Sequence, residues 1–251
     1  MRHGLTRGRW LAVLAVYLVP FLLCMLVLPF IGPSGEDLAG PGAAPDEETD
    51  AFILHELRLP RVALALLAGG ALAMTGACFQ VILRNPLAEP FTLGVTGGAA
   101  VGAVLALSVS WLALDFGILS TVQLFALLGA GAVMLIVYTL ARRPQGISMS
   151  VLLLAGVTLS ILCGGLVLFI RYLADPYSLL SMDRWLMGGL AGTMGFNDLL
   201  PLAPFLLLGL LVLLPQLPAL NHLAMGEGLA AGHGVDVARV QRRIFLGGSL
   251  L

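Results

Sequence analysis

The chain contains no lysine, and all 13 of its basic residues are arginine. A phosphate-binding P-loop needs a lysine beside the phosphates, so this absence argues against ATP hydrolysis by the chain itself. Charged residues are scarce as well: they make up 11% of the 251 residues, whereas 59% are hydrophobic. A soluble domain is closer to half apolar and a quarter charged. The composition therefore indicates a protein whose surface faces lipid.

Cysteine and histidine are also few, and neither forms a cluster. Each of the three cysteines stands alone in an apolar run, without the pairwise spacing of a zinc or redox motif. Small buried side chains are their expected use, and a thiol sensor or metal ligand is the alternative. We therefore predict no metal site and no cofactor in this chain. The residues concerned are Cys24, Cys78, Cys163, His3, His55, His222 and His233.

Long apolar runs dominate the sequence. A hydrocarbon core about 30 Å thick requires roughly 20 apolar residues in a helix, and six runs in the sequence meet that requirement. A seventh begins at Ile244, and the chain stops within it at Leu251, as expected of a fragment. The predicted fold class is an all-α integral membrane bundle with six complete transmembrane helices and the start of a seventh. The expected spans are 10–31, 62–83, 91–114, 116–140, 149–174 and 199–217.

The first apolar run has a competing interpretation as a cleaved signal peptide. It is longer than the roughly 7–15 residues of a signal core, and no A-x-A cleavage site follows it. We therefore interpret 10–31 as a retained first span of a single transmembrane domain covering 1–251.

Two polar interruptions divide the first spans. Residues 32–57 carry seven acids together with prolines and glycines, which predicts an extracytoplasmic acidic loop with a short helix just before Arg58. Residues 84–90 hold two prolines and a turn-forming asparagine, which end one helix and start the next. The residues that we assign to the structure of this inner loop are Asn85, Pro86 and Pro90.

Two further segments interrupt the second half. The glycine-rich run 185–192 is too short to cross a membrane, so we expect a re-entrant or interfacial helix there. A hydrophilic stretch, 221–243, follows the sixth span. Prolines bracket that span at its start and its end: Pro201, Pro204, Pro215 and Pro218.

The arginines predict the orientation, because cytoplasmic segments of membrane proteins carry the excess of basic residues. With the N-terminus inside, nine arginines lie in inner segments and four in outer ones, and the inverted topology reverses that ratio. Eleven of the 14 acids then fall outside. We predict a multi-pass protein of the bacterial inner membrane with a cytoplasmic N-terminus.

Ionisable groups are nearly absent from the centres of the spans, where the polar side chains are residues such as Thr75, Gln80, Thr158 and Ser160. Ion-coupled transporters usually keep titratable groups at this depth, so we expect the energy source to lie on another chain. A secondary transporter driven by an ion gradient stays open as the alternative, because helices after Leu251 could carry such groups. The sequence shows no nucleophile–base pair of the kind that an intramembrane enzyme would need.

Glycines recur inside several spans, including a G-x-x-x-G pair. Small residues let helix backbones approach closely in lipid, so helix packing is the expected role. A wall facing a transported substrate is the alternative. The positions selected for one or the other role are Gly70, Gly76, Gly94, Gly98 and Gly102.

Three stretches of the sequence, in continuous order over roughly 55–251, resemble the FecCD-type permeases of ATP-binding-cassette importers, which take up iron siderophores, haem and vitamin B12. The first stretch is the longest and the most specific. The family usually has more membrane helices than this sequence supplies, and its later glycine-phenylalanine turn has no counterpart here. The matching motifs are 57–61 leading to 84–90 and 93–100, then 185–192, and finally 223–237.

The resemblance implies that Arg58 and Arg61, at the outer mouth of the second span, receive glutamates of a substrate-binding protein. Residues at i and i+3 share a helix face, and guanidinium binds carboxylate through a two-pronged contact. The alternative is that both arginines anchor the helix at the lipid headgroups or pair with Glu56.

The resemblance also implies that 221–243 is a cytoplasmic coupling segment of two short helices that a separate ATPase moves. We expect a helix from Met225 to Ala231, an end at the following glycines, and a cap on the next helix. An ordinary inner loop is the alternative. The residues assigned to coupling are Met225, Gly226, Glu227, Gly232, Gly234 and Asp236.

Taken together, the resemblance implies a permease subunit, not an enzyme, for an iron chelate first and for haem or a corrinoid next. The implied partners are a cytoplasmic ATPase that uses ATP, an extracytoplasmic binding protein, a second permease subunit and membrane lipid, but no nucleic acid. A non-transporting truncated scaffold is a further alternative.

Overall fold

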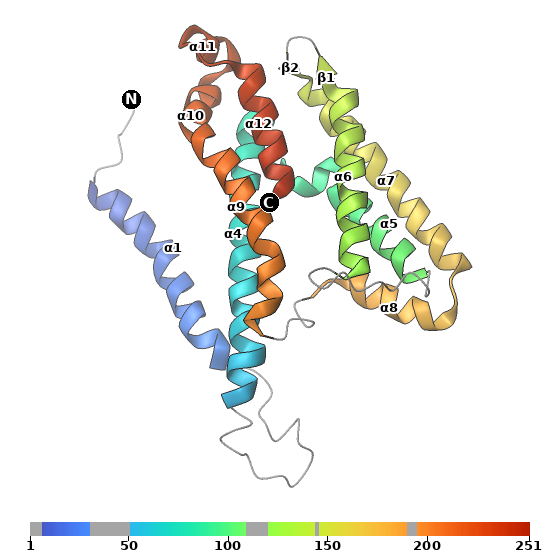
Figure 1. Ribbon diagram of the computed structural model, residues 1–251. Helices are drawn as coiled ribbons and strands as arrows, with labels where there is room; N and C mark the ends of the chain where they lie inside the picture. The colour runs from blue at the N-terminus through green and yellow to red at the C-terminus, as the bar shows by residue number, and fades with distance from the viewer. Residues whose placement is uncertain (1–6, 31–50, 109–119, 144–145, 190–194) are drawn as a thin grey trace. The chain divides into compact units, whose positions relative to one another are not determined.

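The computed structural model describes residues 7–30, 51–108, 120–143, 146–189 and 195–251 (Figure 1). They belong to two compact units. The first comprises 1–67 with 190–199, and the second comprises 68–189 with 200–251. The boundary falls inside one helix, α4 (Leu59–Leu83). The acidic loop expected at 32–57 lies outside the described residues as far as position 50.

The first unit consists of α1 (Arg7–Val27), the 3₁₀ turn η1 (Leu28–Phe30), the π-helical η2 (Ile53–Arg58) and the start of α4. The η5 turn (Phe196–Leu202) begins here and ends in the second unit. The turns η1 and η2 contact each other, and the Arg58 Nη1 donates a hydrogen bond of 3.3 Å to the Pro29 carbonyl. The helix expected just before Arg58 is therefore present, in π-helical form.

The second unit is a helical bundle with one two-residue hairpin, in which Arg142 pairs with Ile147 and Arg143 with Gly146. Several of its helices begin at residues whose side chains cap the first amides. Ser120 and Gln123 form a capping box at the start of α6, for example. After α4, the elements are η3 (Pro90–Leu93), α5 (Val95–Ser108), α6 (Thr121–Ala141), β1 (Arg142–Arg143), β2 (Gly146–Ile147), α7 (Met149–Leu173), α8 (Pro176–Met187), α9 (Ala203–Leu213), η6 (Leu214–Gln216), α10 (Leu217–Met225), α11 (Glu227–Gly232) and α12 (Val237–Leu250).

Five helical stretches among the described residues are long and apolar enough to cross a membrane, namely 11–30, 53–83, 121–141, 149–173 and 199–225. The all-α membrane bundle predicted from the sequence is confirmed, but the count of six spans and the start of a seventh is not reproduced. The third expected span, 91–114, is the reason. Its described part divides at Gly94 into a 3₁₀ turn and the 14-residue α5, and residues 109–114 lie outside the description.

The prolines after the sixth span do not end the helical run, which corrects the predicted boundary at 217. Pro215 lies in the first positions of η6 and Pro218 in the first positions of α10, where the missing N–H has no helical partner to lose. The chain therefore passes through a 3₁₀ turn and continues to Met225. The apolar run that begins at Ile244 is the second half of α12, which starts at Val237.

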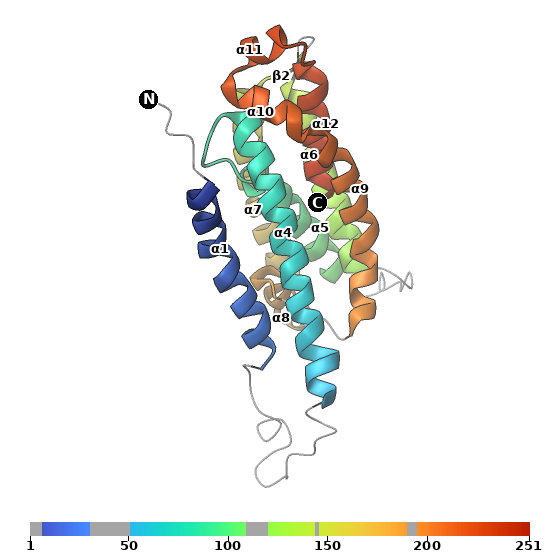
Figure 2. The same cartoon turned by 90° about the vertical axis from the view of Figure 1, so that its left-hand side faces the viewer.

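The short helix near Trp185 lies earlier in the chain than predicted. It is α8, which starts at Pro176 because the Asp175 carboxylate caps its first amides, and it ends at Gly188 with φ +70°. Only 185–187 of the expected 185–192 are helical, and 190–194 lie outside the described residues. Both views place α8 at the end of the second unit opposite to α10 and α11 (Figures 1 and 2).

Glycines bring α5, α6 and α7 into close contact. A Cβ on Gly98 would collide with the Gly129 carbonyl, and one on Gly102 would collide with the Phe125 carbonyl, both on α6. A Cβ on Gly156 of α7 would lie 2.5 Å from the Thr92 carbonyl oxygen. Close backbone approach is the usual means of helix association in lipid, and here it determines the spacing of three consecutive helices.

Candidate functional site

Three segments that are distant in the sequence gather at one end of the second unit. They are the 84–90 turn, the β1–β2 hairpin and the α10–α11–α12 run, and α12 packs directly on β2. Figures 1 and 2 both show α10, α11 and β2 at this end. The orientation predicted from the arginines makes it the cytoplasmic end.

The 84–90 turn has the structural role expected of it. Arg84 adopts φ +49°, a left-handed conformation that ends α4. The Asn85 Oδ1 accepts a hydrogen bond of 3.0 Å from the Leu87 N–H, which closes an Asx turn around Pro86. Pro90 then opens η3 at a position where no helical N–H is required.

The predicted coupling segment folds as two short helices around two glycine corners. Gly226, at φ +126°, separates α10 from α11, so Met225 is the exposed last residue of α10 rather than the first residue of a new helix. Gly232 ends α11, and Gly234 turns the chain at φ +80°. The Asp236 Oδ1 then accepts a hydrogen bond of 3.0 Å from the Arg239 N–H, so Asp236 caps α12 as expected.

Glu227 connects this segment to the other two. Its Oε1 lies 3.8 Å from the Arg84 Nη2 and accepts a hydrogen bond of 3.3 Å from the Gln241 Nε2. Gln241 is buried on α12, and its Oε1 accepts a hydrogen bond of 3.4 Å from the Ile147 N–H of β2. A displacement of α11 therefore acts on the 84–90 turn directly and on the hairpin through Gln241.

Sequence reasoning identified Glu227 but missed its partners Arg84 and Gln241. Their sequence separation leaves no local pattern that relates them. Gln241 carries a weak signal, because it is an uncharged polar residue in the arginine-rich first half of its helix.

The two predicted docking arginines belong to the first unit. Arg58 is the last residue of η2 and Arg61 lies in the first turn of α4, and both side chains are half-buried. Arg58 is oriented by the Pro29 carbonyl. Their role in docking stays a prediction.

The selected glycines separate into two groups. Gly98 and Gly102 lie in helix contacts, and Gly94, at φ +82°, approaches the Gly156 carbonyl oxygen so closely that a Cβ would lie 3.0 Å from it. Gly70 and Gly76 have no atom of a neighbouring segment within 4 Å, so the structure does not support a packing role for them.

Gly76 lines a cavity of about 730 Å³ between α4, the start of α5 and the end of α12. Its lining is mostly apolar and includes Thr75 and Gln80. For Gly76, the alternative role as part of a pathway wall stays a prediction.

At the opposite end of the second unit, an ion pair joins α7 to α8. The Arg171 Nη1 lies 2.6 Å from the Asp183 Oδ1. The sequence did not predict this pair, because the short helix near Trp185 was expected later in the chain.

Comparison with known proteins gives a family for this arrangement. The model of the FecCD transport family matches residues 14–251. The vitamin B12 import system permease protein BtuC of Vibrio vulnificus is 37% identical over 246 residues, which cover 97% of this chain and 70% of that protein. The BtuC protein of Vibrio cholerae is 39% identical over 202 residues, covering 79% of this chain and 58% of that protein.

A relative from Bacillus subtilis, named ABC transporter permease protein YvrB, is 36% identical over 215 residues, covering 84% of this chain and 60% of its own. The chain thus spans 58% to 70% of the length of these three curated relatives. Among solved structures, a metal-chelate type ABC transporter in an inward-facing conformation superposes with a TM-score of 0.77 at 29% identity, covering 95% of this chain and 73% of that one.

Proposed function

Because this chain belongs to the FecCD transport family, we propose that it is the permease subunit of an ATP-binding-cassette importer in the inner membrane. In this role it forms part of the pathway for a metal chelate, and a separate cytoplasmic chain hydrolyses ATP. The match of residues 14–251 to the family model carries the proposal. Relatives named as permease proteins favour it over a transporter driven by an ion gradient or a scaffold without transport.

Among metal chelates we favour a corrinoid. The two Vibrio relatives at 37% and 39% identity are both named vitamin B12 import permeases. The sequence motifs placed an iron siderophore first, but those motifs belong to the framework and the inner turn, and therefore do not discriminate between substrates.

The proposed mechanism is alternating access. A loaded binding protein docks on Arg58 and Arg61, and the substrate enters a pathway between two permease subunits. Closure of the ATPase moves α10 and α11, and the contacts of Glu227 with Arg84 and Gln241 pass that movement to the 84–90 turn and the hairpin.

The test is uptake in a strain that lacks its own corrinoid and siderophore permeases and carries this protein with its partner ATPase and binding protein. We expect labelled cobalamin to accumulate with ATP available, and a labelled ferric siderophore to accumulate less. If the siderophore alone accumulates, the substrate is a ferric siderophore and not a corrinoid. Uptake driven by an imposed proton or sodium gradient without nucleotide would contradict the proposal of an ATP-driven importer.

The docking step has its own test. Replacing both Arg58 and Arg61 by glutamate reverses the charge offered to the binding protein, so we expect stimulation of the ATPase by the binding protein to be lost. Membrane insertion should be normal, which protease protection of the loops would verify. Unchanged stimulation would leave the two arginines with an anchoring role.

A further inference from the structure

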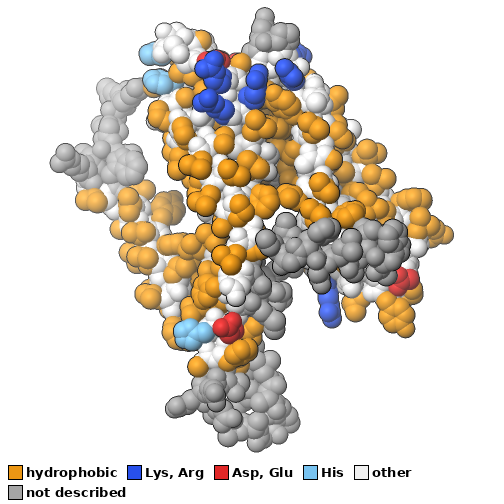
Figure 3. Space-filling view, in the orientation of Figure 1, with side chains coloured by type: hydrophobic (Ala, Val, Ile, Leu, Met, Phe, Trp, Pro, Cys, Tyr) orange, Lys and Arg blue, Asp and Glu red, His pale blue; other side chains and the backbone are white. Residues whose placement is uncertain are grey.

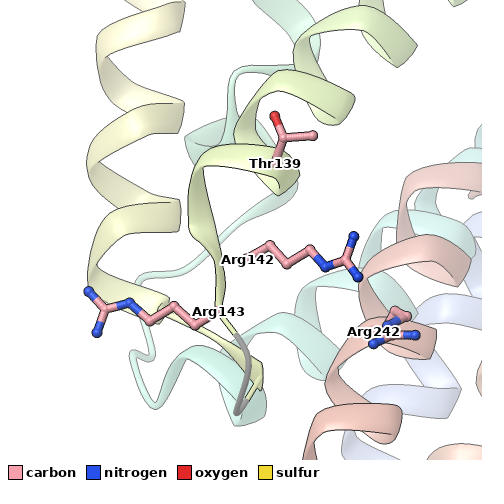
Figure 4. A pocket seen from close by; sticks show the side chains of 4 residues that line it. All are labelled: Thr139, Arg142, Arg143 and Arg242. Atoms are coloured by element: carbon pink, nitrogen blue, oxygen red, sulfur yellow. The ribbon is translucent and has the colours of Figure 1, made fainter.

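Four residues line a cavity of about 370 Å³ at the end of the second unit that carries the hairpin: Thr139, Arg142, Arg143 and Arg242. Thr139 lies in the last turn of α6, the next two arginines form β1, and Arg242 projects from α12. Figure 4 shows the Arg142 side chain reaching toward Arg242, whereas Arg143 points away. Two guanidinium groups, one from β1 and one from α12, therefore converge on one hollow.

The walls of this cavity are held in place by contacts just below it. The rings of Tyr138 and Phe245 pack against each other at 5.5 Å between centroids, one turn deeper on α6 and α12 than the arginines. Above them, Gln241 binds the Ile147 N–H and so fixes α12 to the hairpin. The convergence of Arg142 and Arg242 thus follows from packed elements rather than from two mobile side chains.

No carboxylate neutralises these arginines among the described residues. The ion pairs found there use Arg84, Arg171 and Arg239 instead. Like charges that converge repel each other. An anion between them offsets the repulsion and accepts hydrogen bonds from their N–H groups. Phosphate fits this need, because guanidinium binds it through two parallel hydrogen bonds.

The flank of the cavity faces lipid. On α6, Leu135 lies one turn deeper than Thr139 and is 64% exposed; on α12, Leu246 lies one turn deeper than Arg242 and is 50% exposed. Residues at i and i+4 share a helix face, so Thr139 and Arg242 each lie directly above an exposed leucine. Figure 3 shows the arginine side chains gathered at this end above a continuous hydrophobic flank.

From this combination we infer that the cavity binds the phosphate headgroup of an anionic phospholipid, with its acyl chains along Leu135 and Leu246. Basic pockets between transmembrane helices on the cytoplasmic side are suited to such headgroups. The site does not depend on the importer proposal, since it requires only that α6 spans the membrane.

The experiment measures the phospholipid that the purified protein retains, by native mass spectrometry, after exchange into phosphatidylcholine nanodiscs with or without phosphatidylglycerol or cardiolipin. We expect the wild type to retain the anionic lipid selectively. The affinity of the double variant Arg142→Gln with Arg242→Gln for the anionic lipid should fall by about tenfold or more, because charged hydrogen bonds are lost. Arg242→Lys, which keeps the charge without the planar fork, should lie between the two.

Arg243→Gln is the matched control: it removes the same charge from α12 at a residue that does not line the cavity. Equal loss in this control, or undiminished retention in the double variant, overturns the site. Displacement of the lipid by inorganic phosphate at similar concentration overturns the lipid assignment in favour of a free anion. If the double variant loses co-purification of the ATPase but retains the lipid unchanged, the lipid assignment is overturned in favour of an acidic protein surface.

Discussion

The α5–α6–α7 packing and the α10–α12 segment are held together by opposite means. In the first, Gly98 and Gly102 let backbones touch, with no polar side chain between them. In the second, Glu227 and Arg84 are each about half exposed, at 48% and 52%, and their contacts are polar. Lipid supplies no hydrophobic drive between helices, so contact there depends on shape. Water competes with the half-exposed contact between Glu227 and Arg84, so that contact is individually weak.

This difference assigns the two regions different tasks. Shape-dependent contacts between glycines and carbonyls have one good arrangement and resist displacement. Half-exposed ion pairs and hydrogen bonds exchange partners at small cost, which suits a segment that a separate ATPase is proposed to move. Four predictions test the contrast, beginning with the largest expected effect.

Gly102→Ala should be the most damaging change. Its Cβ would collide with the Phe125 carbonyl, so we expect the free energy of unfolding to fall by about 1–3 kcal/mol. Unfolding in mixed micelles, followed by circular dichroism, measures it. Gly131→Ala on α6, where no neighbour lies within 4 Å, is the control and should change little. Equal losses in both variants would mean that helix contact does not depend on these glycines.

Gln241→Ala should have the next largest effect. Gln241 is buried, and its loss leaves the Ile147 N–H without its acceptor, which costs about 1–2 kcal/mol. Hydrogen exchange at the Ile147 amide should become faster. Unaltered exchange there would show that the hairpin is held without α12.

Glu227→Ala should cost less than about 1 kcal/mol, because the Glu227 carboxylate is half exposed and water competes for its contacts. Coupling should suffer more than stability: stimulation of the ATPase by the binding protein should fall while unfolding is nearly unchanged. Glu227→Gln keeps an oxygen for the Gln241 amide and loses only the ion pair, so its ATPase stimulation should lie between that of the wild type and that of Glu227→Ala. Full stimulation in Glu227→Ala would reject Glu227 as a coupling residue.

The smallest effect concerns the cap of α8 and depends on pH. Hydrogen bonds from the Ser178 hydroxyl, then from the Ser178 N–H and the Tyr177 N–H, hold the pKa of Asp175 below its usual value. The lowered pKa means that the cap contributes fully above the unfolded-state pKa and is lost as the pH falls through the folded-state value. The protection of the Tyr177 and Ser178 amides, measured against the intrinsic exchange rate at each pH, should therefore fall in acid.

Asp175→Asn provides the control for that titration. It keeps an oxygen for the two amides but has no charge to lose, so the protection of the Tyr177 and Ser178 amides relative to their intrinsic exchange should become independent of acid. The same pH dependence in this variant would place the titrating group elsewhere.

Much of the architecture was predictable because lipid imposes simple rules on the sequence. Apolar runs of sufficient length located the helices of four spans to within a few residues at most ends, and the asparagine and prolines of 84–90 located a turn. Element ends were less predictable. Pro215 and Pro218 resemble helix terminators but occupy first-turn positions. The start of α8 was also missed, because it depends on the cap that Asp175 forms.

By itself, the sequence determined that this protein lies in a lipid bilayer, which family it resembles and where its local turns lie. Composition, motifs and caps act through neighbouring residues. Only the tertiary structure decided which residues meet: Glu227 with Arg84 and Gln241, Gly102 with Phe125, and Arg142 with Arg242 around a cavity. Such contacts depend on how helices are rotated and spaced against one another. That rotation results from the packing of the whole unit, and no short stretch of sequence encodes it.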